Sequence, residues 1–209
     1  MPHRRTLFER VLYYYPVIHA QSDLGTLGDV SHQIIRDKIG EESLAERITK
    51  INKLWEKIRK SVTELDIDYK KARIYQDGLP ICNYADKIVN DLASSGSINH
   101  QIILELQEKG SVLMGTECPD FLLDEYYLIK EALLGEQESK EKFDLNKFKA
   151  DQDLLLHKRD EFIANRINDT LNKKETGILF LGVLHTIEAR LDKDIHVIHP
   201  IDIGLSIDA

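Results

Sequence analysis

Cysteine is scarce in this sequence, and long apolar runs are missing from it. The 209 residues include only two cysteines, Cys82 and Cys118, which are too few for a disulfide framework and predict reduced thiols. No run approaches the ~20 apolar residues that a membrane helix needs, and the basic N-terminal segment lacks the apolar stretch of a signal peptide. We therefore expect a cytoplasmic protein that does not insert in a membrane.

Basic residues are outnumbered by acidic ones. Lys and Arg total 28 against 36 Asp and Glu, which gives a net charge of −8. Binding to nucleic acids or anionic membranes requires a basic protein surface, so no nucleic acid and no membrane is expected as a partner. The remaining composition, 42% hydrophobic and 31% charged, is that of an ordinary globular protein whose 209 residues can bury a core.

Common catalytic signatures are missing as well. The sequence has no HExxH, no CxxC, no G-x-S-x-G and no dinucleotide-binding glycine fingerprint. Zinc-protease helices, nucleophile elbows and nucleotide-cofactor loops of the usual kinds are therefore not expected, and candidate site residues must be sought elsewhere in the chain.

Strand-like and helix-like patterns alternate along the chain. Strands are predicted near 11–18, 72–76, 111–116, 178–184 and 194–198, and helices near 29–39, 41–65, 83–94, 98–109, 119–134 and 157–171. This alternation predicts a single α/β domain over 1–209, with a mostly parallel central sheet flanked by helices. Helical insertions are expected at about 41–66, 81–109 and 120–145, and the charged segment 135–147 has the composition of the least ordered part.

The clearest helical pattern covers residues 41–65, where apolar residues recur at three- and four-residue steps. Its apolar face could serve a homodimer or a partner helix. Packing on the chain's own sheet is the usual fate of such a face, and we expect it here, with the homodimer as the alternative.

Polar residues follow four of the predicted strands directly. They are His19, Asp77, Glu117 and His185. Ligands of open α/β sheets bind outside the carboxyl ends of the strands, so we expect these side chains to meet at one edge of the sheet. Two imidazoles and two carboxylates suit a divalent metal such as Mn²⁺, Co²⁺ or Zn²⁺. They would equally serve as a metal-free general base with its orienting acid.

Two arginines project from the apolar arc of the late helix. Arg159 and Arg166 are seven residues apart and share this arc with Ile163 and Ile167. They could hold the site's carboxylates, stabilise an oxyanion, or form a buried ion pair without chemistry. Because Arg166 has the more apolar neighbours, we expect it to be enclosed and to serve the fold, and Arg159 to be partly wet and to serve the site.

The late helix and the strand after it carry a pair of motifs. The helix has RDEFIA at 159–164, matching R-[DN]-x-x-[MIWF]-A, and the strand closes with GVLH at 182–185, matching G-x-x-H. With a histidine after the first strand and a carboxylate after a middle strand, the pattern resembles the erythromycin esterase/TraB/ChaN/Tiki superfamily. At the end of the first predicted strand this chain has PVIH at 16–19, where the family usually has GxxH. After the second predicted strand it has Asp77, where the family tends to have glutamate.

The resemblance implies an α/β core with the site at one sheet edge. Some members of the superfamily look like esterases, some like metal-dependent peptidases, and one branch binds haem. Fold alone does not choose among these activities.

Two functional hypotheses follow. The first is a hydrolase of ester or peptide-type bonds that acts on a small molecule or a peptide, with or without a divalent metal. Its catalytic residues would be His19, Glu117, Arg159 and His185. If a metal is bound, its ligands would be His19, Asp77, Glu117 and His185. The second is a non-catalytic protein on the same scaffold that binds a small ligand, haem or a regulatory partner.

Overall fold

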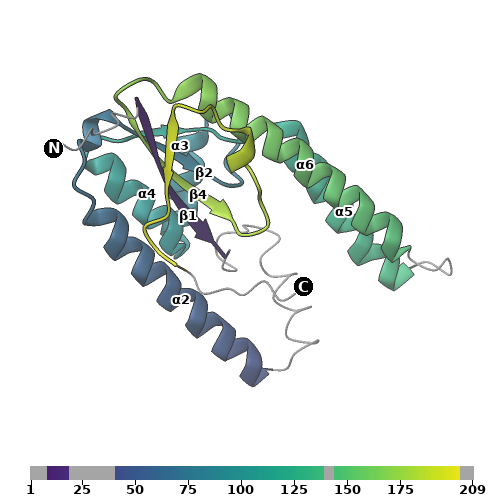
Figure 1. The fold of residues 1–209 in the computed structure, drawn as a ribbon. Helices are drawn as coiled ribbons and strands as arrows, with labels where there is room; N and C mark the ends of the chain where they lie inside the picture. Colours follow the sequence, from purple (N-terminus) through teal and green to yellow (C-terminus); the bar gives the residue numbers. More distant parts are fainter. Residues whose placement is uncertain (1–8, 19–40, 139–143, 203–209) are drawn as a thin grey trace.

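The computed structural model describes residues 9–18, 41–138 and 144–202 (Figure 1). The strands of its sheet are β1 Arg10–Val17, β2 Ala72–Gln76, β3 Val112–Met114, β4 Thr176–Gly182 and β5 Ile195–Ile198. The helices are α2 Glu41–Thr63, α3 Ala85–Ser94, α4 Ile98–Glu108, α5 Pro119–Glu138 and α6 Leu145–Thr170, with short 3-10 turns at Tyr69–Lys71 and Glu188–Arg190. The helix predicted at 29–39 and His19 lie outside the described residues.

The five strands form one sheet in the order β3-β2-β4-β1-β5, and every neighbouring pair is parallel. The prediction of an α/β fold with a parallel central sheet is therefore confirmed. β4 lies in the middle of the sheet, and its residues from Gly177 to Gly182 are all buried, as expected for a parallel strand covered on both faces.

Helices cover both faces of the sheet. On one face, α2, α3 and α4 pack over Tyr15, Ile74 and Phe180. On the other face, α6 packs over Tyr75, Leu179 and Leu181, and α5 runs alongside α6 in a long helical pair (Figure 1). The alternation of buried side chains along β4 divides the core into these two layers.

The apolar face of α2 packs against the chain's own sheet, as predicted. Ile51, Trp55, Ile58 and Val62 lie in the same core cluster as the strand residues, and Trp55 is fully buried beside Phe180. The buried face of α2 is thus occupied within the chain.

The α5–α6 pair differs from the sequence prediction. Helix α6 begins at Leu145, well before the predicted start near 157, because Asp144 caps it by accepting hydrogen bonds from the backbone N–H groups of Asn146 and Lys147. Helix α5 runs on to Glu138. Both ends of the charged segment 135–147 are therefore helical in the structure, up to Glu138 and from Leu145 onwards.

Strand β3 is shorter than the predicted strand at 111–116, ending at Met114. Pairing resumes after two residues as an isolated parallel bridge between Pro80 and Glu117. None of the helices that the structure describes is long and apolar enough to cross a membrane.

Candidate functional site

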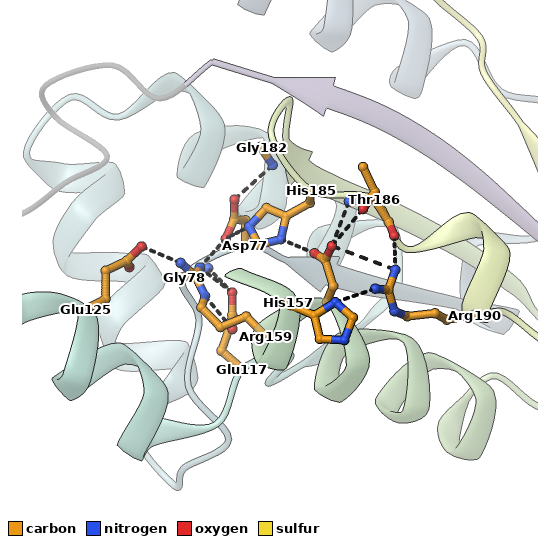
Figure 2. A network of polar contacts seen from close by, with 11 residues as sticks. Asp77, Gly78, Glu117, Glu125, His157, Arg159, Gly182, His185, Thr186 and Arg190 are labelled. Atoms are coloured by element: carbon orange, nitrogen blue, oxygen red, sulfur yellow. Dashed lines mark hydrogen bonds and ion pairs between the residues drawn. The ribbon is translucent and has the colours of Figure 1, made fainter. Parts of the chain in front are cut away.

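The carboxyl ends of β2, β3 and β4 converge on one group of polar side chains. Asp77 follows β2 directly, Glu117 follows the end of β3, and His185 lies in the turn after β4 (Figure 2). One possible metal-ligand atom from each residue lies within 4.8 Å of those of the other two, and the three residues are buried. The predicted meeting of these three residues is confirmed. His19 lies outside the described residues, so its part in the site stays a prediction.

The backbone holds Asp77 and Glu117 in place. The N–H of Asp77 donates to the carbonyl of Phe180 at 2.9 Å, and the Asp77 carboxylate accepts from the N–H of Gly182 at 2.8 Å. The main chain of Glu117 donates to Leu79 O at 3.0 Å and accepts from Ile81 N at 2.9 Å. Asp77 is thereby fixed to β4, and Glu117 to the loop that follows Asp77.

Gly115 makes this arrangement sterically possible. A Cβ atom at that position would lie 2.7 Å from the carbonyl oxygen of Pro80 and 2.7 Å from Cα of Ile81, too close for any side chain. The absence of a side chain lets the segment before Glu117 approach the loop after β2, and so brings Glu117 beside Asp77.

Arg159 on α6 binds three carboxylates. Its Nη2 donates to Glu117 Oε1 at 2.7 Å and to Asp77 Oδ1 at 3.0 Å, and its Nε donates to Glu117 Oε2 at 3.2 Å. Its Nη1 donates to Glu125 Oε1 on α5 at 2.5 Å. These contacts raise the pKa of Arg159 against the opposing effect of burial, so the guanidinium is charged.

The prediction that Arg166 is enclosed and Arg159 partly exposed was wrong. Arg159 is 5% exposed, whereas Arg166 is only half-buried and donates from Nε to the carbonyl of Gly115 at 3.0 Å. The reason lies in tertiary contacts: α5 and the strand ends cover Arg159, while Arg166 lies beside the end of the short edge strand β3. Arg159 does contact Asp77 and Glu117, and its role in a functional site stays a prediction.

Asp160, the residue next to Arg159, orients His185. Its Oδ1 lies 2.6 Å from His185 Nδ1, and its Oδ2 accepts from the N–H and the hydroxyl of Thr186, each at 3.0 Å. Because Nδ1 faces this carboxylate, the other ring nitrogen, Nε2, faces Asp77, with 3.6 Å to Asp77 Oδ1. Asp160 thus fixes the ring of His185 and presents Nε2 to the other two candidate ligands.

Burial and close charges shift the acidities of these groups. Burial lowers the pKa of His185, but the hydrogen bonds to Asp160 and Asp77 outweigh it and raise this pKa to about 9. Burial raises the pKa of Glu117 above its ordinary value, against the lowering effect of Arg159. Burial also acts to raise the pKa of Asp160, but the bonds from His185 and Thr186 lower it overall. Without a metal, this pKa makes His185 a cation at neutral pH, a form that can donate a proton but not accept one.

A cavity of about 350 Å³ adjoins this group of residues. Asp77, Arg159 and His185 are among the residues that line it, whereas Glu117, which is 0% exposed, is not. Ile18, the last described residue before His19, also lines the cavity. The site therefore has room for a ligand next to its charged groups.

Three residues of the site were not predicted from the sequence. Asp160 is the second letter of RDEFIA, and that motif was the one signal that marked it. Glu125 and Gln76 carried no signal, because Glu125 lies in an ordinary helical segment and Gln76, which lines the cavity, is the last residue of β2.

Comparisons of the chain with protein-family models, with curated proteins and with solved structures give no match. The superfamily resemblance of RDEFIA and GVLH therefore stays a prediction, and a proposal about function has to rest on the geometry of the site.

Proposed function

We propose that this protein is a hydrolase of ester or amide bonds whose site holds a divalent metal ion between Asp77, Glu117 and His185. The observation that carries the proposal is the mutual approach, within 4.8 Å, of one ligand atom from each of these three buried side chains. They come from three different strand ends, and two of them line a cavity.

The donor set fits Mn²⁺, Co²⁺ or Zn²⁺. Carboxylate oxygens and an imidazole nitrogen bind such ions at roughly 2.0–2.2 Å, so two ligands of one ion lie about 3–4 Å apart. The ligand atoms that lie farthest apart would need to close in by about 1–2 Å. Each carboxylate has lone pairs beyond those that Arg159 uses, so the arginine can stay in place when an ion binds.

Charge balance also supports a bound cation. The buried carboxylates are Asp77, Glu117 and Asp160, and the buried arginine that pairs with the first two is Arg159. A divalent ion with a neutral His185 would balance these charges, which low-polarity surroundings favour. The contact of Asp160 with His185 Nδ1 is the carboxylate–histidine arrangement common behind metal ligands.

Each residue has a definite task in the proposed reaction. Hydrolysis adds water to a carbonyl carbon, breaks the C–O or C–N bond and returns a proton to the leaving group. The ion would supply Lewis acidity at the carbonyl. Arg159 holds the Asp77 and Glu117 carboxylates next to each other, and Asp160 keeps His185 Nε2 directed at them. The cavity beside Asp77 and His185 would receive the substrate.

A second candidate function is supported by Arg159. This one guanidinium already pairs with Asp77, Glu117 and Glu125, an ion-pair network that holds these carboxylates without any metal. A protein with such a network would bind a small ligand in the cavity without acting on it.

Calorimetric titration with Mn²⁺, Co²⁺ and Zn²⁺ separates these functions. The wild-type protein should bind one ion, and His185→Ala should lose that binding. His196→Ala is the matched control, because His196 pairs in register with Val11 at the amino end of β1, the opposite end from the site. Equal binding by wild type and His185→Ala would refute the metal site. Metal binding without turnover of any p-nitrophenyl ester or p-nitroanilide in a panel of acyl groups would favour the second candidate.

A further inference from the structure

The cavity beside the proposed metal site is mostly apolar, and three helices contribute to its wall. Each helix supplies two residues that lie about one turn apart and therefore on one face. They are Ile88 and Leu92 from α3, Glu125 and Ile129 from α5, and Leu156 and Arg159 from α6. Concave sites with apolar walls and a few polar groups are typical sites for small ligands.

Helices α5 and α6 place charged and apolar side chains in a fixed order along the cavity. The two helices run side by side in opposite directions (Figure 1), and Glu125 of α5 pairs with Arg159 of α6 at 2.5 Å. Ile129 follows Glu125 by four residues, and Leu156 precedes Arg159 by three. Both apolar residues therefore lie on the same side of the ion pair, about 5 Å further along the helices. A ligand with its polar group near Arg159 can extend along Ile129 and Leu156.

The walls also distinguish between kinds of apolar ligand. No Phe, Tyr or Trp among the described residues lines the cavity. Nucleobases and other aromatic groups gain specific binding energy by stacking on such rings. Walls of Ile, Leu and Val offer burial without a stacking surface, which suits an aliphatic chain better than an aromatic ring.

The size of the cavity limits the length of that chain. A volume of about 350 Å³ holds about ten to twelve non-hydrogen atoms at ~30 Å³ each. The reacting group of an ester or amide uses about three of them, which leaves room for about six to eight further carbon atoms. Leu184 lines the cavity and is 73% exposed, so the cavity opens to the surface there and a larger leaving group can remain outside.

We propose that the cavity binds an aliphatic chain of about six to eight carbon atoms, and that the substrate is an ester or amide of such an aliphatic acid. The substrate class rests on the proposed function: water adds its hydroxyl to the acyl carbon, the bond to the leaving oxygen or nitrogen breaks, and a proton goes to the leaving group. The acyl carbonyl lies beside Asp77 and His185, and the aliphatic chain extends along Ile129 and Leu156.

Primary amides with one common head group test the binding of the chain. Propanamide, hexanamide, octanamide and decanamide differ only in length. In 5-hydroxypentanamide a hydroxyl replaces the terminal methyl group of hexanamide, and benzamide carries an aromatic ring instead of the chain. Binding to the metal-free full chain is followed by NMR shifts of the methyl groups of Ile129 and Leu156 and of the backbone amides of Gly78 and Gly182, which all line the cavity.

Each added methylene should tighten binding roughly three- to fourfold up to octanamide, because each one leaves water for the apolar wall. Decanamide should gain little more. Hexanamide should bind at least about tenfold more tightly than 5-hydroxypentanamide, whose hydroxyl would be buried without a partner, and more tightly than benzamide. Binding that is independent of chain length, a further steep gain with decanamide, or tighter binding of benzamide than of hexanamide would overturn the proposal.

A pair of variants on α6 tests the location. Leu156→Trp should fill the cavity and weaken the binding of octanamide at least about tenfold. Leu154→Trp is the matched control, because Leu154 is 55% exposed and is not among the residues that line the cavity, and it should bind as the wild type does. Wild-type affinity in Leu156→Trp would overturn the location. The wild-type series of amides decides the matter even if this variant folds poorly.

The outcome is separate from that of the metal titration. Binding that depends on chain length, without metal binding, would refute the proposed hydrolase and leave the aliphatic site standing. Metal binding without any dependence on chain length would refute the aliphatic site alone.

Discussion

Replacing Arg159 should destabilise the protein far more than replacing Arg166. Arg159 is 5% exposed and pairs with Glu117, which is 0% exposed, and with Asp77, which is 7% exposed. Arg159→Ala leaves these carboxylates buried without their cation, which typically costs ~3–5 kcal/mol. Arg166→Ala removes one hydrogen bond from a half-buried side chain, worth about 1 kcal/mol.

Thermal unfolding checks this difference. In a chain of this length, 1 kcal/mol corresponds to roughly 2–4 °C in melting temperature, so Arg159→Ala should melt roughly 6–20 °C below wild type and Arg166→Ala only roughly 2–4 °C below. The deficit of Arg159→Ala should shrink as the pH falls, because protonation neutralises the carboxylates that have lost their partner.

A double-mutant cycle shows whether the lost charge or the lost packing is responsible. If uncompensated charge is the cause, adding Glu117→Gln to Arg159→Ala should recover part of the stability, with a coupling of at least ~1 kcal/mol. An Arg166→Ala variant that melts below Arg159→Ala would refute the reasoning, and a coupling near zero would assign the loss to packing.

Three further predictions concern the groups around Arg159. In the metal-free protein the folded-state pKa of His185 is raised from 6.5 to about 9, so its contribution to stability is fully present below pH 6.5 and is lost as the pH rises to about 9. The free energy of unfolding of the metal-free wild type, measured with denaturant, should therefore fall over this pH range, and that of His185→Gln should change less. Asp160→Asn should weaken metal affinity by roughly 10–100-fold in calorimetry, because His185 loses its orienting carboxylate, and an unchanged affinity would contradict that role. Gly115→Ala should lower the free energy of unfolding by about 1–3 kcal/mol, because the new Cβ would meet the backbone of Pro80 and Ile81. If the variant has the melting temperature of the wild type, the loop after β2 can move aside at no cost, and the reasoning is wrong.

The fold was largely predictable because its signals are local. The continuously apolar run of β4 indicated a central parallel strand, and the three- and four-residue steps of α2 indicated a helix with one buried face. Since the carboxyl ends of parallel strands share one edge, the meeting of Asp77, Glu117 and His185 followed from strand positions alone.

The features that sequence reasoning missed depend on contacts between distant elements. Asp160 follows Arg159 in the chain and points about 100° away around the helix, so the two bind different partners, and only the course of the turn after β4 decides that Asp160 meets His185. The enclosure of Arg159 depends on α5, which supplies Glu125 from 34 residues away. Chain neighbours such as Phe162 gave no information about either contact.

Anomalous X-ray diffraction from crystals grown with Mn²⁺, Co²⁺ or Zn²⁺ tests the proposed site most directly. A peak at the metal's absorption edge should lie between the carboxylates of Asp77 and Glu117 and the Nε2 of His185, at about 2.0–2.2 Å from each ligand atom. The same crystals without an anomalous peak there, with Arg159 still binding both carboxylates directly, would contradict the metal site.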